Sequence, residues 1–228
     1  MQAHHPLNRP IWSALTTRQA GLAVGDGRAV RFAPDYGLFA AAVDTAPESL
    51  AALASLVRAQ GEVALVEAEA PPAVPGTAVS SRAIIWQMTA ESLTPGEPPS
   101  FGIVPLSEAD AQQMLALATL TRPGPFFART HQLGDFVGVT QDGELVAMAG
   151  ERMKPTGFTE VSGVCTHPDH RGRGYAGALM RVVAARILAR AETPFLHAYA
   201  SNTGAIGLYE SLGFALRREL AMTVLTRA

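Results

Sequence analysis

The sequence predicts an α/β protein in two parts, a smaller lobe over residues 1–100 and a larger α/β domain over residues 101–228. Short β-branched runs alternate with helical stripes of apolar residues along the chain. Residues 92–100 are rich in proline and glycine and separate the two parts. Of the 228 residues, 48% are hydrophobic and 17% are charged, so the chain can bury a core and is too apolar to be disordered.

The N-terminal part is predicted to hold a few short elements, with the proline-rich stretch 70–81 as a loop. Gly61 stands where the C-cap of the predicted helix belongs. This lobe is either a degenerate copy of the fold of the second part or an unrelated α/β lobe, and the sequence leaves both open. The expected elements are a hairpin around Gly25-Asp26-Gly27, a helix over 49–59 and strands over 62–66 and 82–90.

The second part alternates strands and helices more regularly. Ser107 is a plausible N-cap for its first helix, and Asp142-Gly143 is a strong hairpin signal. Residues 121–134 are expected to form a loop or an irregular helix. The expected elements are strand 102–105, helix 107–120, strands 135–140, 144–153 and 159–166, helix 171–190, strand 195–200, helix 202–212 and two final strands ending at residue 225.

The turn between strand 159–166 and the helix after it predicts an anion-binding site. Gly172 and Gly174 let the backbone approach a ligand, and Arg171 and Arg173 add positive charge suited to phosphate oxygens. A helix begins here, so its unpaired backbone N–H groups and its dipole favour a negative group. The segment therefore predicts a pyrophosphate cradle.

A dinucleotide fingerprint is also contained in this turn, as Gly172-x-Gly174-x-x-Gly177. Its context does not fit, because residues 167–171 stand between the strand and the first glycine. That fingerprint also needs an acidic residue after the next strand, where this chain has Ser201. The sequence therefore argues against a dinucleotide.

Read from Arg171, the turn is Arg-x-x-Gly-x-Ala, which resembles the acyl-CoA signature of the GNAT superfamily of N-acetyltransferases. Residues 202–214 are similar to the second motif of that family, N-x-x-A-x-x-L-Y-x-x-x-G-F. The resemblance covers about residues 101–228 and is closest to the group that shares the C-terminal domain of glycine N-acyltransferase-like proteins. It implies a GNAT-type mixed, mostly antiparallel twisted sheet flanked by helices.

The resemblance implies acetyl-CoA, or another short acyl-CoA, as the cofactor. Cys165 is interpreted as a small core residue, because direct transfer to an amine needs no cysteine nucleophile. We assign no metal site. The residues that the resemblance places at the cofactor are Val164, Cys165, Thr166, Arg171, Gly172, Arg173, Gly174, Tyr175, Ala176 and Asn202, the last of which also fits a helix N-cap.

The resemblance implies two catalytic residues. Tyr209 stands at the position of the general acid for the leaving thiolate, although its spacing also fits a buried helix stripe. Glu160 lies in a stretch that looks like the Phe-x-Glu-Ile of histone-type members, where the glutamate accepts the amine proton. A surface glutamate is the alternative. Glu151 and His197 are the other candidate bases.

The loop over residues 121–134 is where this family usually shapes the acceptor pocket. Phe126, Phe127 and Arg129, with His131, could form a partly aromatic pocket with a cation for a carboxylate, or the phenylalanines could be core residues. His197 is kept as a further candidate for contact with the substrate.

The predicted function is an acetyl-CoA-dependent N-acetyltransferase that transfers the acetyl group directly to the amine of a small molecule, an amino acid or related metabolite. The alternatives are a non-catalytic acyl-CoA-binding or sensor module and a protein N-terminal or lysine acetyltransferase. The net charge of −2 argues against nucleic acid as a partner, and no apolar stretch predicts a membrane span. We expect a cytoplasmic protein, with a homodimer as the candidate assembly.

Overall fold

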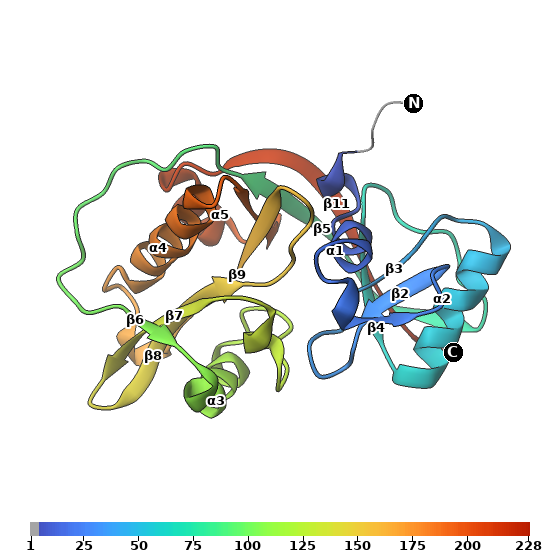
Figure 1. The fold of residues 1–228 in the computed structure, drawn as a ribbon, viewed down its shortest axis with the longest axis horizontal. Helices are drawn as coiled ribbons and strands as arrows, with labels where there is room; N and C mark the ends of the chain where they lie inside the picture. Colours follow the sequence, from blue (N-terminus) through green and yellow to red (C-terminus); the bar gives the residue numbers. More distant parts are fainter. Residues whose placement is uncertain (1–4) are drawn as a thin grey trace.

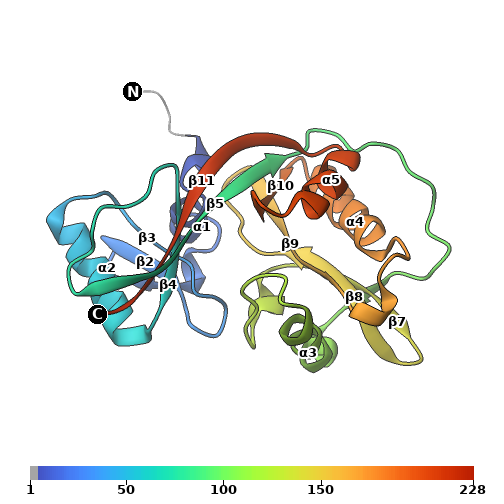
Figure 2. The ribbon, with the colours of Figure 1, turned by 180° about the vertical axis from the view of Figure 1, so that it is seen from behind.

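The computed structural model describes residues 5–228, so the first four residues of the predicted N-terminal lobe lie outside the described residues. Figures 1 and 2 show two lobes connected by two long, curved strands, β5 (Thr77–Thr89) and β11 (Ala215–Arg227). Both strands belong to an eight-stranded sheet with the order β4-β11-β5-β10-β9-β8-β7-β6. A separate three-stranded sheet, β1-β2-β3, lies in the N-terminal lobe.

The N-terminal lobe confirms the predicted hairpin and helix. Gly61 ends α2 with a φ of 87°, a backbone conformation that glycine adopts without strain. Helix α1 (Pro10–Thr16) was not expected, because its buried residues Ile11, Ala14 and Leu15 make too short a run to predict a helix. The other elements are β1 (Ala23–Gly25), β2 (Ala29–Phe32), β3 (Ala40–Ala42), α2 (Pro47–Gln60) and β4 (Val63–Glu67).

The second part follows the predicted order of elements up to α5. Ser107 and Asp110 form a capping box ahead of the first helix, and the turn at Asp142 (φ 52°) and Gly143 (φ 86°) joins β7 to β8 as predicted. The elements are β6 (Val104–Leu106), α3 (Ala111–Thr121), β7 (Phe136–Gln141), β8 (Glu144–Glu151), β9 (Phe158–Thr166), α4 (Tyr175–Ala189), β10 (Thr193–Tyr199) and α5 (Thr203–Ser211).

The predicted mixed, mostly antiparallel sheet is confirmed. Within the eight-stranded sheet, β9 and β10 form the only parallel pair among the described strands. Helix α4 packs on one face, with Leu179, Val183 and Ile187 buried against apolar residues of β7, β8 and β10. Helix α3 covers the other face of β8 and β9. Successive side chains of β8 therefore point to opposite faces of the sheet and belong to two different hydrophobic cores, one under α4 and one under α3.

The C-terminal end of the chain differs from the prediction. A single strand, β11, stands in place of the two expected strands, because a register shift between Leu216 and Arg218 bends it without ending it. Strand β5 also begins earlier, at Thr77, inside the stretch that was predicted to be a loop. It lies between β10 and β11, so the sheet continues across the predicted boundary near residue 100, and that boundary stays a prediction.

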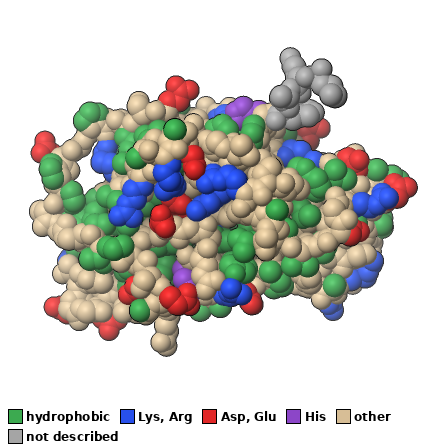
Figure 3. Space-filling model, viewed as in Figure 1, with side chains coloured by type: hydrophobic (Ala, Val, Ile, Leu, Met, Phe, Trp, Pro, Cys, Tyr) green, Lys and Arg blue, Asp and Glu red, His purple; other side chains and the backbone are tan. Residues whose placement is uncertain are grey.

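Charged side chains on the surface are mixed in sign. On the face shown in Figure 3, Lys and Arg lie among Asp and Glu, and apolar side chains are scattered between them. Within residues 5–228, none of the helices has the length and apolarity needed to span a membrane.

Candidate active site

The site opens where two strands of the large sheet separate. Strands β9 and β10 pair only from Phe158 to Glu160 and from Thr193 to Phe195. Beyond these residues they diverge, and β9 carries an irregularity opposite Ala149 at which Gly163 adopts a φ of 63°. A Cβ on Gly163 would lie 3.0 Å from the Phe136 ring, so both the backbone and the available space favour glycine there. The divergence exposes backbone of β9 to a ligand.

A groove of about 810 Å³ runs from this opening along the N-terminus of α4. It contains all ten residues that were predicted at the cofactor, from Val164–Thr166 on β9, through the turn at Arg171–Ala176, to Asn202 at the start of α5. The structure therefore brings these sequence motifs together along one surface.

The turn at the end of the groove has the geometry of an anion cradle. Gly172 and Gly174 have φ values of 75° and 78°, and Gly174 is the N-cap residue of α4. Among the described residues, the backbone N–H groups of residues 172–177 have no hydrogen-bond acceptor. Arg171 and Arg173 are exposed beside them. These donors and charges suit the pyrophosphate of an acyl-CoA.

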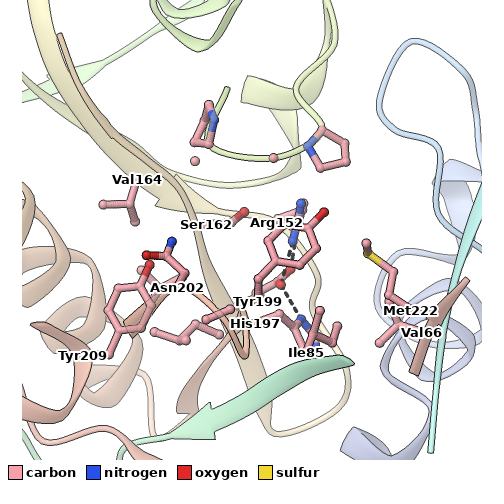
Figure 4. Close-up of a pocket in the computed structure, with 18 of the residues that line it drawn as sticks. Val66, Ile85, Arg152, Ser162, Val164, His197, Tyr199, Asn202, Tyr209 and Met222 are labelled. Atoms are coloured by element: carbon pink, nitrogen blue, oxygen red, sulfur yellow. Dashed lines mark hydrogen bonds and ion pairs between the residues drawn. The ribbon is translucent and has the colours of Figure 1, made fainter. Parts of the chain in front are cut away.

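A second cavity, of about 130 Å³, adjoins the groove and is called the acceptor pocket below. Its far wall comes from the N-terminal lobe and the long strands, through Phe39, Val66, Ile85 and Met222. In the view of Figure 4, Tyr209, Asn202 and Val164 lie toward one end, Val66 and Met222 toward the other, and Arg152 between them. The residues shared by groove and pocket are Pro123, Gly124, Val164, Tyr199, Asn202 and Tyr209.

Tyr209 stands at this junction, half-buried on α5. Its hydroxyl group has no hydrogen-bond partner among residues 5–228, and burial raises the pKa of the phenol. Asn202 caps α5 by accepting a hydrogen bond from the backbone N–H of Ala205 at 3.2 Å, which confirms its predicted capping role. A neutral phenol at the junction can donate a proton into either cavity.

Glu160 lines the acceptor pocket, but both oxygens of its carboxylate already accept hydrogen bonds. Its Oε1 accepts hydrogen bonds from Arg152 Nη2 (2.8 Å) and His197 Nδ1 (2.8 Å), and its Oε2 accepts from Arg152 Nε (2.9 Å) and the Met153 backbone (3.3 Å). Burial alone would raise the pKa of this carboxyl group, but the Arg152 charge and hydrogen bonds, with those of His197, hold it well below its usual range. These four bonds use the acceptor sites of the carboxylate.

His197 is fixed in one tautomer by its neighbours. Arg217 donates to Gln87 Oε1 (2.7 Å), and Gln87 Nε2 donates to the Leu7 carbonyl (3.0 Å). The amide nitrogen of Gln87 therefore donates its second hydrogen to His197 Nε2 at 3.1 Å, and His197 donates its Nδ1–H to Glu160. Neither Glu160 nor His197 has a free lone pair for an amine proton in this arrangement, which is a physical argument against the predicted role of Glu160 as general base.

Several predicted substrate residues lie outside the pocket. The loop after α3 contributes Pro123, Gly124 and Pro125, whereas Phe126 packs edge-on against Phe136 in the α3 core. Phe126, Phe127 and Arg129 are not among the residues that line the pocket, so their contact with the substrate stays a prediction that this geometry does not support. Arg129 is exposed and stacks on the Tyr36 ring at 4.6 Å.

The contacts of Glu151, a candidate general base, and the burial of Cys165 bear on their chemical roles. Glu151 is buried in ion pairs with Arg190 and Lys154 and does not line the acceptor pocket. Burial raises the pKa of the Cys165 thiol to about 11, so the side chain is a thiol rather than a reactive thiolate.

Sequence reasoning missed Arg152 and Gln87, which complete the polar side of the pocket. Arg152 lies near the end of the predicted strand 144–153 and belongs to no motif, and Gln87 lies in the part of the chain that was assigned to the other lobe. An arginine directly after a buried strand, eight residues before Glu160, is the one local signal that could have identified Arg152.

Comparisons with known proteins agree with this geometry. Residues 136–222 match the family described as FR47-like protein. The chain is 49% identical to an acetyltransferase assigned to the GNAT family from Novosphingobium aromaticivorans, over 98% of this chain and 99% of that one, with a TM-score of 0.92. No curated protein sequence matches the chain.

Two more distant structures share the fold over most of their length. A GCN5-related N-acetyltransferase from Kribbella flavida is 22% identical over 93% of each chain, with a TM-score of 0.61. A GCN5-related N-acetyltransferase-like protein from Streptococcus suis is 17% identical over 94% of this chain and 92% of that one, also with a TM-score of 0.61.

The splayed strands, the cradle and the adjoining pocket agree with the fold of these acetyltransferases. The close match over both lobes places the chain in a family: it belongs to the GNAT family of acetyltransferases and is an enzyme of that class.

Proposed function

We propose that this enzyme transfers an acetyl group from acetyl-CoA directly to the amine of a small molecule. The observation that carries the proposal is the junction of the groove and the acceptor pocket, which share Tyr209, Asn202 and Val164. A thioester that reaches the end of the groove and an amine in the pocket would meet there, which is the positioning that direct transfer requires.

Two parts of the groove bind two different parts of the acyl-CoA. The N-terminus of α4 and the two glycines before it hold the pyrophosphate. The edge of β9 at Val164–Thr166 that β10 leaves unpaired holds the pantetheine arm as an added strand would be held. When bound, the thioester supplies the acetyl group and a thiol as the leaving group.

Tyr209 Oη holds the proton that the leaving sulfur needs. The raised pKa of this phenol keeps it protonated at neutral pH, and its acidity is close enough to that of a thiol for transfer. In this proposal Glu160 positions Arg152 and His197 instead of accepting the amine proton, because its lone pairs are already occupied. The amine proton leaves through water in the open part of the pocket.

A small acceptor is favoured over a polypeptide because the pocket has a closed end. Buried Phe39, Val66 and Ile85 wall it on the side of the N-terminal lobe. A protein N-terminus or a lysine would need a groove that is open at both ends. A non-catalytic acyl-CoA-binding module would need no such pocket beside Tyr209.

The direct test is isothermal titration with acetyl-CoA, followed by release of free CoA in the presence of a panel of small amines. We expect saturable binding of acetyl-CoA and amine-dependent release of CoA. Binding without release for any amine would favour the sensor module. The absence of binding would overturn the proposal.

A further inference from the structure

We propose that Arg152 binds the carboxylate of the acceptor, so that the substrate is an α-amino acid with an apolar side chain; this inference rests on the proposed function. Arg152 follows directly after β8 and lines the acceptor pocket between its two ends. The cation sought on the loop after α3 is thus supplied from a different part of the chain.

Only one edge of the Arg152 guanidinium is occupied. Its Nε and one N–H of Nη2 form the bidentate pair with Glu160. Among residues 5–228, no acceptor is bonded to Nη1, so this nitrogen and the second N–H of Nη2 leave a complete fork unpaired. Such a fork matches the two oxygens of a carboxylate.

The guanidinium is also held rigidly. One face stacks on the Phe39 ring, with Cζ 4.6 Å from the ring centroid, and the side chain is 11% exposed. Gln19 donates to the Arg152 carbonyl at 2.7 Å. A preorganised fork costs little entropy when it binds a ligand, and its low exposure strengthens a charged hydrogen bond.

The charges around the fork favour an anion. Among the residues that line the pocket, Arg152 is the one arginine or lysine and Glu160 is the one carboxylate, and the two form an ion pair. His197 is hydrogen-bonded to Gln87, behind which Arg217 adds a second cation. Arg152, Arg217 and Glu160 together carry one net positive charge, which the ionised carboxylate of an amino acid with a neutral amine would balance.

The apolar walls of the pocket determine which side chain the acceptor amino acid can carry. Phe39, Val66, Ile85 and Met222 give the far end an apolar lining, and the ion pair of Arg152 with Glu160 also lines the pocket. With its carboxylate on Arg152, an α-amino acid can direct its amine toward Tyr209 and its side chain toward this apolar end (Figure 4). A long cationic or acidic side chain would be left unpaired there.

The test compares binding of carboxylates with binding of matched amides to the wild-type protein. Isothermal titration in the presence of CoA would use N-acetyl-L-leucine and N-acetyl-L-leucinamide, then the same pair for alanine, methionine and phenylalanine. We expect the carboxylate to bind at least about tenfold more tightly than the amide in at least one pair. Equal binding of acid and amide in every pair, or binding of no carboxylate, would overturn the inference.

A variant of Arg152 then tests whether its unpaired guanidinium edge causes the preference for a carboxylate. Arg152→Lys keeps a cation beside Glu160 but loses the second pair of donors, so KM for the accepted amino acid should rise at least about tenfold while kcat changes little. Arg129→Lys is the matched control, because that arginine lies outside the pocket, and its kinetics should equal those of the wild type. An unchanged KM in Arg152→Lys would also overturn the inference.

These outcomes separate the two proposals. If acetyl-CoA binds and uncharged amines are acetylated as well as amino acids, the proposed function stands and the role of Arg152 fails. If acetyl-CoA does not bind, the proposed function itself fails.

Discussion

The groove and the acceptor pocket meet at Tyr209, yet they are built in different ways. The cradle of the groove is backbone: a short turn with two left-handed glycines and the free N–H groups at the start of α4. The polar side of the pocket is a chain of side chains that links Leu7, Gln87 and His197 to Glu160 and Arg152. Binding in the groove should therefore depend on local backbone conformation, whereas the pocket should depend on the packing of both lobes.

The largest effect is expected for Glu160→Gln, which breaks the ionic network of the pocket. Arg152 would lose a charged, bidentate partner in a nearly buried position, so the free energy of unfolding at neutral pH should fall by about 3 kcal/mol or more. Urea denaturation of both proteins across a pH series from about 2 to 8 would measure the difference.

The pH dependence of that difference has a defined sign. The folded state lowers the pKa of Glu160, so the stability it contributes is fully present above the unfolded pKa of about 4.3 and is lost as pH falls toward the folded pKa. The gap between the two proteins should stay constant above about pH 6 and narrow below about pH 4.3. A gap that widens on acidification would contradict the network as described. Glu62→Gln, an exposed glutamate, is the control and should show no comparable gap.

The same contrast explains what could be predicted from the sequence. The groove could be predicted because its motifs are contiguous in the sequence, and Arg171–Ala176 and Asn202 line this one groove. The acceptor pocket could not, because Phe39, Ile85 and Arg152 are brought together only when β5 and β11 pair across the lobes. Strand pairing over such separations leaves no local pattern, and for the same reason the sheet was not expected to cross residue 100.

The next largest effect is expected for Tyr209→Phe, at the junction of the two regions. Without the phenol, the leaving sulfur has no proton donor, so kcat should fall by about 10² or more. The affinity for acetyl-CoA should not change, because removal of the hydroxyl leaves the ring in place against its neighbours. Single-turnover rates and titration with acetyl-CoA would separate the two quantities.

Tyr199→Phe is the matched control, since this tyrosine also lines both cavities but belongs to neither motif. If Tyr199→Phe lowers kcat as much as Tyr209→Phe does, or if Tyr209→Phe leaves the rate unaffected, then the role of the acid does not belong to Tyr209.

The smallest effect is expected for Gly174→Ala, which tests whether the groove depends on backbone alone. The φ of Gly174 is 78°, and a Cβ there would meet no atom within 4 Å, so any cost comes from the left-handed conformation and not from a clash. That cost is roughly 1–2 kcal/mol for alanine. We expect the affinity for acetyl-CoA to fall about tenfold, while KM for the amine and kcat at saturating acetyl-CoA stay close to the wild-type values.

Gly21→Ala separates this effect from the general consequences of replacing glycine. Gly21 also has open space around the position of a Cβ, but its φ is not positive, so alanine should be accommodated without loss of affinity. If Gly174→Ala raised KM for the amine instead of weakening acetyl-CoA binding, the turn would be coupled to the acceptor pocket through α4, and the two regions could not be treated as independent. If only acetyl-CoA binding weakened, the backbone of one short turn would account for the cradle.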